Sequence, residues 1–229
     1  MLHLPNARSL EQRVRHANSN KVPMNIFVIH NNYPSAYNKT DADAFIIEKP
    51  VIYTLTDTAL TKDGKPFFIP DFASPCTFQM SLVLRISRLG RSISPRFAHR
   101  YYDALTVGVM FTAQNLFEYC VSHSLPWEMA KGFDGAAALG RFVTLTEESK
   151  ALSGYDFHLE RDGETIQKSG MTQPRFSPEE LIADISRFYT LRQGDLLYYG
   201  FPCSPEKATV NTRLTAFLGN TQVLSFNVK

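Results

Sequence analysis

Short apolar runs separated by turn residues divide this sequence, and they have the spacing of strands rather than of long regular helices. Alternate residues of a strand face a core, so brief apolar runs bounded by Gly, Pro, Asn or Asp are typical of β-rich domains. The pattern predicts an α+β fold that is mostly β, with a few short helices. The expected strands are 26–30, 45–47, 78–86, 104–112, 141–145, 155–159, 196–200, 210–217 and 223–228.

Local signals predict where helices and hairpins begin. In Ser94-Pro95 and in Ser177-Pro178-Glu179-Glu180, a hydroxyl can accept hydrogen bonds from free amide groups and proline fits the first turn. Apolar residues at helical spacing predict a third helix over 115–123. The Asp-Gly pairs at 63–64 and 162–163 are typical hairpin turns.

Composition indicates one globular domain. With 229 residues, of which 44% are hydrophobic and 12% aromatic, the chain can form one sizeable core. A net charge of +2 favours neither nucleic acid nor a membrane as a partner, and no apolar run approaches the roughly 20 residues of a membrane helix. Three widely spaced cysteines, Cys76, Cys120 and Cys203, predict neither a disulfide framework nor a zinc site. We expect a cytoplasmic protein with a flexible extension over 1–24 and a single domain over 25–229.

Five blocks of the sequence, in the same order, resemble the fumarylacetoacetate hydrolase family. They lie at 26–33 with 48–50, 78–86, 105–115, 125–134, and 162–167 with 194–202. The fourth block is the most similar, because Trp127, Lys131, Phe133 and Asp134 all fall at family positions. The resemblance implies a mixed β-sandwich roll and a homodimer, and it implies chemistry in which Mg²⁺ or Mn²⁺ polarises a 2-oxo acid or β-dicarbonyl while a His–Glu pair activates water.

This sequence departs from the family at the residues that carry that chemistry. Positions 79, 81 and 110, where the family has its metal carboxylates, are Gln79, Ser81 and Met110, and the His–Glu pair corresponds to Ala36 and Lys39. Neutral oxygens and a thioether are poor ligands for a small divalent ion. A shift in alignment does not restore the ligands, because no Asp or Glu occurs between residues 71 and 103 or between 103 and 118. We therefore expect no cofactor, and Mg²⁺ or Mn²⁺ only if the site has been rebuilt.

The expected ligand pocket is also altered. By the resemblance, a substrate-binding Arg becomes Gln114, a Gln becomes Phe117 and a Thr becomes Phe201, so the pocket should be more apolar and less cationic. Lys131 and Asp134 remain. Lys131 could attract an anion or serve as a base, or the two residues could form a structural ion pair or surface contacts. The candidate pocket residues are Gln79, Ser81, Met110, Gln114, Lys131, Asp134 and Phe201.

Other residues carry weaker hypotheses. His30 could replace the missing base but is better interpreted as structural, and Cys203 as an incidental thiol. Met110, Phe111 and Phe117 are expected to fill the core. A basic run from 85 to 100 is expected to be a solvated face. A relocated metal site could use acidic residues from elsewhere in the chain, namely Glu128, Asp134, Glu160 and Asp195.

Three functions remain open at this stage. The favoured hypothesis is a non-catalytic or weakly active relative that binds a small anionic or apolar ligand or serves as a partner subunit. The first alternative is a divergent enzyme (hydrolase, isomerase or decarboxylase) that acts on a 2-oxo acid or an acylpyruvate-like compound. The second alternative is a structural, oligomer-forming protein with a closed pocket. Only the site can distinguish them, because one fold supports several functions.

Overall fold

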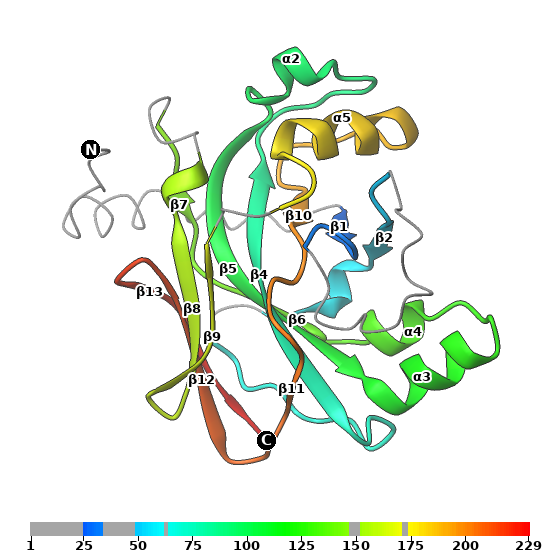
Figure 1. The fold of residues 1–229 in the computed structure, drawn as a ribbon, viewed down its shortest axis with the longest axis vertical. Helices are drawn as coiled ribbons and strands as arrows, with labels where there is room; N and C mark the ends of the chain where they lie inside the picture. Colours follow the sequence, from blue (N-terminus) through cyan, green and yellow to red (C-terminus); the bar gives the residue numbers. More distant parts are fainter. Residues whose placement is uncertain (1–24, 34–48, 62–63, 147–151, 171–173) are drawn as a thin grey trace.

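The larger of two β-sheets is built around a pair of long antiparallel strands, β4 (Cys76–Ile86) and β5 (Tyr102–Ala113) (Figure 1). The computed structural model describes residues 25–33, 49–61, 64–146, 152–170 and 174–229. The other strands of this sheet are β1 (Ile26–Ile29), β2 (Ile52–Leu55), β3 (Leu60–Thr61), β6 (Ala137–Leu139), β7 (Val143–Thr144), β10 (Leu196–Tyr198) and β11 (Glu206–Lys207). Within the described residues the order is β2-β1-β10-β4-β5-β6-β3, with β11 also on β4 and β7 also on β5. The β1–β10 and β3–β6 pairs are parallel, so the sheet is mixed.

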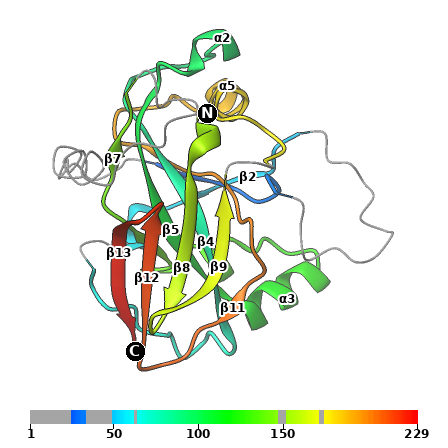
Figure 2. The same cartoon turned by 60° about the vertical axis from the view of Figure 1, so that its left-hand side comes forward.

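The second sheet is antiparallel and contains β8 (Asp156–Arg161), β9 (Glu164–Gly170), β12 (Thr212–Leu218) and β13 (Thr221–Val228). Figure 2 shows these strands side by side in the order β13-β12-β8-β9. The β8–β9 hairpin turns at Asp162 and Gly163, whose φ values of +53° and +90° suit an Asp-Gly turn. The structure confirms the hairpin that this dipeptide predicts.

Short helices cover the two ends of the larger sheet (Figure 1). They are α2 (Pro95–Ala98), α3 (Gln114–Ser122), α4 (Glu128–Lys131) and α5 (Pro178–Phe188), with 3-10 turns at Asp57–Ala59 and Leu152–Gly154. The predicted start of α5 is confirmed by a reciprocal cap, in which Ser177 Oγ accepts from Glu180 N (3.2 Å) and Glu180 Oε2 accepts from Ser177 N (2.7 Å). The cap expected at Ser94 is wrong, because that hydroxyl makes no capping bond and α2 ends after four residues.

Alternation along the strands divides the buried apolar residues into two clusters. The main core joins β4 and β5 to the second sheet and to α5, through residues such as Phe78, Phe111, Leu181 and Phe226. The opposite face of the larger sheet carries a second, smaller cluster. Its members include Tyr53, Val83, Met110 and Tyr198, with Trp127 and Phe201 packed against it. Phe27, near the start of the described chain, and Val228, near its end, both belong to the main core.

Most of the expected strands are present, with shifted ends. The segment 141–145 forms only the two-residue strand β7, 210–217 begins later as β12, and 45–47 lies outside the described residues, as does residue 63 of the other expected hairpin. Strands β2, β3, β6, β9 and β11 were not predicted. Strand β9 is polar along most of its length because it lies at the edge of the second sheet, where few side chains are buried. The mixed, β-rich fold class is confirmed.

Two expectations about the chain's organisation stay predictions. Residues 1–24 lie outside the described part, so the boundary between an extension and a domain over 25–229 is not tested. Across the described segments, no helix has both the length and the apolar character needed to span a membrane.

Candidate active site

Three of the candidate residues are neighbours on one face of the central strand pair. Gln79 lies opposite Met110, Ser81 opposite Gly108, and Thr77 opposite Thr112 in the β4–β5 ladder. Side chains two residues apart on a strand share a face, so these residues point away from the main core that Phe78 and Phe111 occupy. The structure thus brings Gln79, Ser81 and Met110 together, as the resemblance implied.

The donor set on this face does not fit a divalent metal in the family manner. Gln79 is buried, and its Nε2 donates a hydrogen bond of 2.6 Å to the carbonyl of Cys203. The buried Ser81 hydroxyl donates to the carbonyl of Leu82 at 3.0 Å. Met110 packs in the second apolar cluster. A neutral amide oxygen, an engaged hydroxyl and a thioether lack the anionic oxygens that compensate Mg²⁺ or Mn²⁺ for lost hydration.

The acidic residues considered for a relocated site do not meet. Asp195 is fully buried and is used by neighbouring amides, whereas Glu160 lies on the second sheet, where its carboxylate is 3.6 Å from His158 Nε2. Glu128 is exposed in α4, and Asp134 is exposed beyond that helix. Within the described residues, no group of three or more His, Cys, Asp or Glu side chains is placed to hold a metal.

Titration of chelator-stripped protein with Mn²⁺ in a calorimeter is expected to show no saturable binding below millimolar concentrations. The double variant Gln79→Glu/Met110→Asp places two carboxylates on facing positions of β4 and β5, and it should acquire saturable binding. Equally tight Mn²⁺ binding by the unmodified chain would mean that carboxylates at positions 79 and 110 are not needed to hold the ion.

Lys131 is the charged group buried at this site. It is the last residue of α4, it is 6% exposed, and its Nζ donates a 3.3 Å hydrogen bond to Thr112 Oγ1. The ammonium also lies 4.6 Å from the centre of the Phe117 ring and 5.9 Å from that of Phe201. Burial lowers the pKa of Lys131 to about 8. The ammonium therefore lies on the same face as Gln79 and Met110, two residues farther along each strand, where Thr77 faces Thr112.

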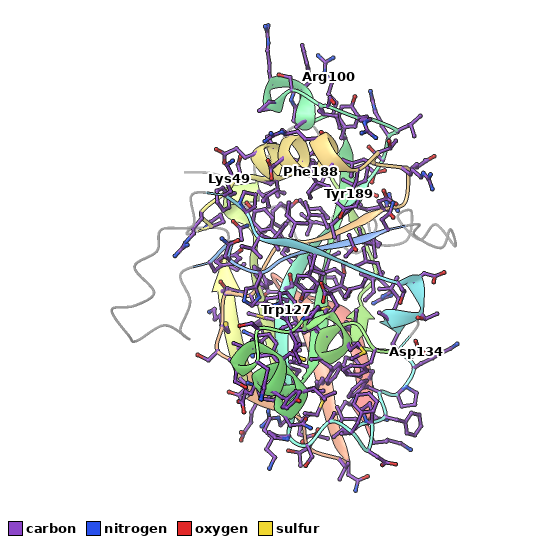
Figure 3. The ribbon with its side chains drawn as sticks, turned by 90° about the vertical axis from the view of Figure 1, so that its right-hand side faces the viewer. Lys49, Arg100, Trp127, Asp134, Phe188 and Tyr189 are labelled. Atoms are coloured by element: carbon purple, nitrogen blue, oxygen red, sulfur yellow. The ribbon has the colours of Figure 1, made fainter. Side chains whose placement is uncertain are left out.

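The expected ion pair between Lys131 and Asp134 is wrong, and so is the expectation of surface contacts for Lys131. In the described part of the chain no ion pair joins the two residues, because Lys131 is buried at the end of α4 whereas Asp134 is exposed. Figure 3 shows Asp134 at the periphery, with Trp127 nearer the middle of the view. Asp134 is therefore not part of the site.

A group of aromatic side chains continues from Phe117, the ring beside the ammonium, to Trp127. The Trp127 ring is 5.5 Å from His30, 5.8 Å from Phe117 and 4.8 Å from Tyr53, measured between centroids. The His30 imidazole remains in contact with solvent, yet partial burial and then the positive charge of Lys131 lower its pKa below the ordinary value. The imidazole is therefore neutral at pH 7. We call His30, Thr112, Phe117, Lys131 and Phe201 the Lys131 cluster.

Of the remaining candidate residues, Phe201 belongs to the Lys131 cluster and Gln114 lies beside it. Gln114 begins α3, where its Nε2 donates to Glu118 (2.9 Å) and its Oε1 accepts from Thr77 (3.3 Å), so it borders the cluster through Thr77. Phe201 belongs to the cluster, as its ring contact with Lys131 shows. Ala36 and Lys39 lie outside the described residues.

Two further hypotheses receive a structural answer. Burial raises the pKa of Cys203, so its thiol is protonated and lacks the character of a nucleophile. Met110 and Phe111 fill the two apolar clusters as expected, whereas Phe117 is only partly buried and contacts Lys131 instead.

Sequence reasoning missed Thr112, the hydrogen-bond partner of Lys131. The signal was available in the strand pattern, because Thr112 lies two residues after Met110 and a strand places such residues on one face. Sequence reasoning also missed Tyr53 and Tyr198, which are buried in the second cluster beside Met110. No local pattern marks them, because they come from strands that are distant in sequence.

Asp195 holds together the strands beside the site. Its carboxylate accepts from the backbone N–H groups of Asn25 (2.9 Å) and Arg192 (2.8 Å) and from Asn25 Nδ2 (3.1 Å), which fixes the start of β1 next to β10. Asp195→Asn is expected to lower the free energy of unfolding by about 3 kcal/mol, because the new amide nitrogen cannot accept these bonds. Urea denaturation measures the change. The exposed Asp71→Asn variant should stay within about 0.5 kcal/mol of the unmodified protein, and an equal loss in both would contradict the assignment.

Comparison with known proteins gives the same family as the sequence blocks. A mouse protein named oxaloacetate tautomerase FAHD1, mitochondrial, is 24% identical over 205 residues, which cover 90% of this chain and 91% of the mouse protein. An oxaloacetate decarboxylase, mitochondrial, of Dictyostelium discoideum is 28% identical over 165 residues, covering 72% and 73% of the two chains. The crystal structure of fumarylpyruvate hydrolase from Pseudomonas aeruginosa in complex with Mn²⁺ and pyruvate matches with a TM-score of 0.78 and 22% identity over 93% of each chain, which shows a shared fold.

The family profile described as fumarylacetoacetate (FAA) hydrolase C-terminal matches residues 25–223. That match includes β1, the β4–β5 pair, the Lys131 cluster and β10. The chain belongs to the fumarylacetoacetate hydrolase family.

Proposed function

We propose that this chain is a divergent enzyme of its family that binds a small 2-oxo-acid-like anion at Lys131 and decarboxylates, tautomerises or hydrolyses it. The observation that carries the proposal is the buried Lys131 ammonium, which lies on the family's site face with a neutral hydroxyl, Thr112, as its partner. Among the described residues the ammonium has no acidic partner; a buried cation of this kind is costly for stability, and such groups concentrate at functional sites. The names of the relatives, a tautomerase, a decarboxylase and a hydrolase, supply the reaction classes.

The electrostatics support an anionic ligand. The phenyl faces of Phe117 and Phe201 stabilise the ammonium only weakly, so a carboxylate or enolate oxygen beside Nζ would gain a charge-assisted hydrogen bond in a largely dry environment. Neutral His30 stands at the solvent side of the same cluster, where it can accept or return a proton. The chain's own residues thus provide anion binding and proton transfer.

A second candidate function is ligand binding without turnover, either as a sensor of the anion or as a partner subunit. It is favoured by Gln79, Ser81 and Met110, which bring no carboxylate to the face where the family places its metal. A structural protein with a closed site is the third candidate, and it predicts that no small anion binds at Lys131.

The test is turnover of oxaloacetate and fumarylpyruvate by the purified chain, in the presence of a chelator and separately with Mn²⁺. We expect metal-independent turnover that Lys131→Met lowers by roughly 100-fold, as loss of a buried charged contact of about 3 kcal/mol requires. The matched control is Lys207→Met: Lys207 is exposed and pairs with Thr77 of β4, so it tests for a general effect of losing a positive charge near the cluster but outside it. Saturable pyruvate binding without turnover of either compound would favour the second candidate, and no binding would favour the third.

We also propose a homodimer, as the resemblance implies, in the cytoplasm and without a nucleic-acid or membrane partner. The net charge of +2 supports the last two points. Light scattering on the purified chain measures its oligomeric state, and a monomeric mass at micromolar concentration would contradict the dimer.

A further inference from the structure

The donor set beside Lys131 leaves the reaction without an obvious electron sink. Decarboxylation or tautomerisation of a 2-oxo acid requires electrons to be drawn toward the C2 carbonyl, and in metal enzymes a bound cation does this. Here the facing positions of β4 and β5 carry an amide and a thioether, Gln79 and Met110. Lys131 is the group on this face whose chemistry could provide a covalent electron sink.

We propose that Lys131 forms an imine with the C2 carbonyl of a 2-oxo acid, so that a covalent iminium ion replaces the family's metal as the electron sink. The proposal rests on the proposed function and names its mechanism. It is carried by the position of Nζ, which within the described residues donates one hydrogen bond, 3.3 Å long, to Thr112 and lies between two aromatic rings on the site face.

The surroundings of Nζ favour a nucleophilic amine. In the described part of the chain no carboxylate pairs with Lys131, so no anion stabilises the charged form, and the packing of Phe117 and Phe201 further limits hydration. Burial lowers the pKa of Lys131 to about 8, which makes about a tenth of the amine neutral at pH 7. Desolvated lysines of this kind are the ones that form Schiff bases with carbonyl compounds.

The atoms and electrons of the step balance. The Lys131 ammonium and the 2-oxo group give an iminium ion and one water, because two ammonium protons leave with the carbonyl oxygen. In a 2-oxo acid whose C4 is a carboxylate, as in oxaloacetate, the electrons of the C3–C4 bond then move toward the iminium nitrogen, CO₂ leaves and an enamine forms. The enamine takes a proton at C3, and one water hydrolyses the resulting iminium ion to the product 2-oxo acid and free Lys131. The enamine's C3 proton comes from solvent, because the neutral His30 imidazole carries no acidic proton at pH 7; in tautomerisation of the same iminium ion, His30 is the group of the cluster suited to remove the C3 proton.

Reductive trapping tests the proposal with the intact chain. The protein is incubated with pyruvate and a chelator, treated with borohydride, digested and analysed by mass spectrometry; borohydride supplies the hydride that converts an iminium ion to a stable secondary amine. We expect one carboxyethyl group on Lys131 at substoichiometric reagent, and none on the exposed Lys168 or Lys207. Oxaloacetate should compete with pyruvate for labelling.

Variants separate this mechanism from the function on which it rests. Lys131→Arg keeps the positive charge but cannot form an imine, so it should lose all labelling and lose turnover by roughly 100-fold, as Lys131→Met does, while retaining pyruvate binding, whereas Lys207→Arg should behave as the unmodified chain. Turnover of oxaloacetate without an adduct on Lys131, or adducts spread evenly over the exposed lysines, would overturn the imine and leave the proposed function standing. Absence of both turnover and pyruvate binding would overturn the proposed function itself. Because the labelled site is located in the unmodified chain, the test does not depend on the folding of any variant.

Discussion

Replacing Lys131 with Met is expected to raise the free energy of unfolding at pH 7 by up to about 3 kcal/mol, even though it removes anion binding. Burial lowers the pKa of Lys131 to about 8 from an ordinary value of 10.5, so at pH 7 the folded chain bears the cost of a poorly solvated charge. Methionine has a similar length and no charge, and the aromatic rings around Nζ can pack against it. Urea denaturation at pH 7 measures the change.

The sign of the pH dependence follows from linkage. Between about pH 8 and 10.5 the unfolded chain holds a proton on Lys131 that the folded chain has lost, so stability contributed by this residue rises with pH across that window. Below about pH 8, the pKa of Lys131 in the folded chain, Lys131 is protonated in both the folded and the unfolded chain, and its burial then lowers the free energy of unfolding by the full amount. The free energy of unfolding of the unmodified chain should therefore approach that of Lys131→Met as the pH rises toward 10. Urea denaturation of both proteins across this pH range measures the difference.

Lys131→Arg is the matched control for this effect. Its guanidinium stays charged throughout the window, so the variant should show neither the gain in stability at pH 7 nor the rise above pH 8. Identical pH profiles for the unmodified chain and Lys131→Met would mean that the ammonium is hydrated or paired in solution. Together these variants separate the role of Lys131 in function from its cost in folding.

Phe111→Ala is expected to lower the free energy of unfolding by about 4 kcal/mol. Phe111 is fully buried on β5, stacks on Phe67 at 3.5 Å between ring centroids, and contacts Phe78 and Phe226 at 5.9 and 6.1 Å. Phe226 belongs to β13, so this ring cluster joins the two sheets. Truncation removes the transfer free energy of the ring and leaves a cavity at the junction.

The control for the ring cluster is Phe68→Ala. Phe68 is 64% exposed, and truncating it should change the free energy of unfolding by no more than about 0.5 kcal/mol. Urea denaturation of both variants measures the contrast. A loss below about 1 kcal/mol in Phe111→Ala would show that the sheets are held together elsewhere. Phe111 lies between Met110 and Thr112 on the strand, so its variant should also weaken the placement of Thr112 beside Lys131.

Several elements could be predicted from sequence because their signals are local. The capping box at Ser177 and Glu180 needs only residues three apart, and the Asp162-Gly163 turn needs only two. The short apolar runs at 78–86 and 104–112 predicted the central strands. Blocks of family residues predicted the fold class and placed Gln79, Ser81 and Met110 on one site. For the same reason the lack of acidic residues near these positions was visible in the sequence alone.

The partner of Lys131 could not be predicted in this way. The spacing of three residues between Lys131 and Asp134 suggested an ion pair. In the structure α4 ends at Lys131, which is buried, whereas Asp134 is exposed. Thr112, from a strand nineteen positions earlier, is the partner instead. Similarly, Asp195 was a candidate metal ligand in the sequence, whereas the structure uses it to tie Asn25 to Arg192.

The sequence by itself determined the family, the β-rich fold class and the chemical identity of the side chains at the site, because these depend on local pattern and composition. Only the tertiary structure decided that Lys131 is buried, that its neighbours are Thr112, Phe117 and Phe201, and that its pKa is lowered. The physical reason is that burial and pairing depend on which strands and helices meet in space, and contacts between residues distant in the chain leave no periodic trace in the sequence.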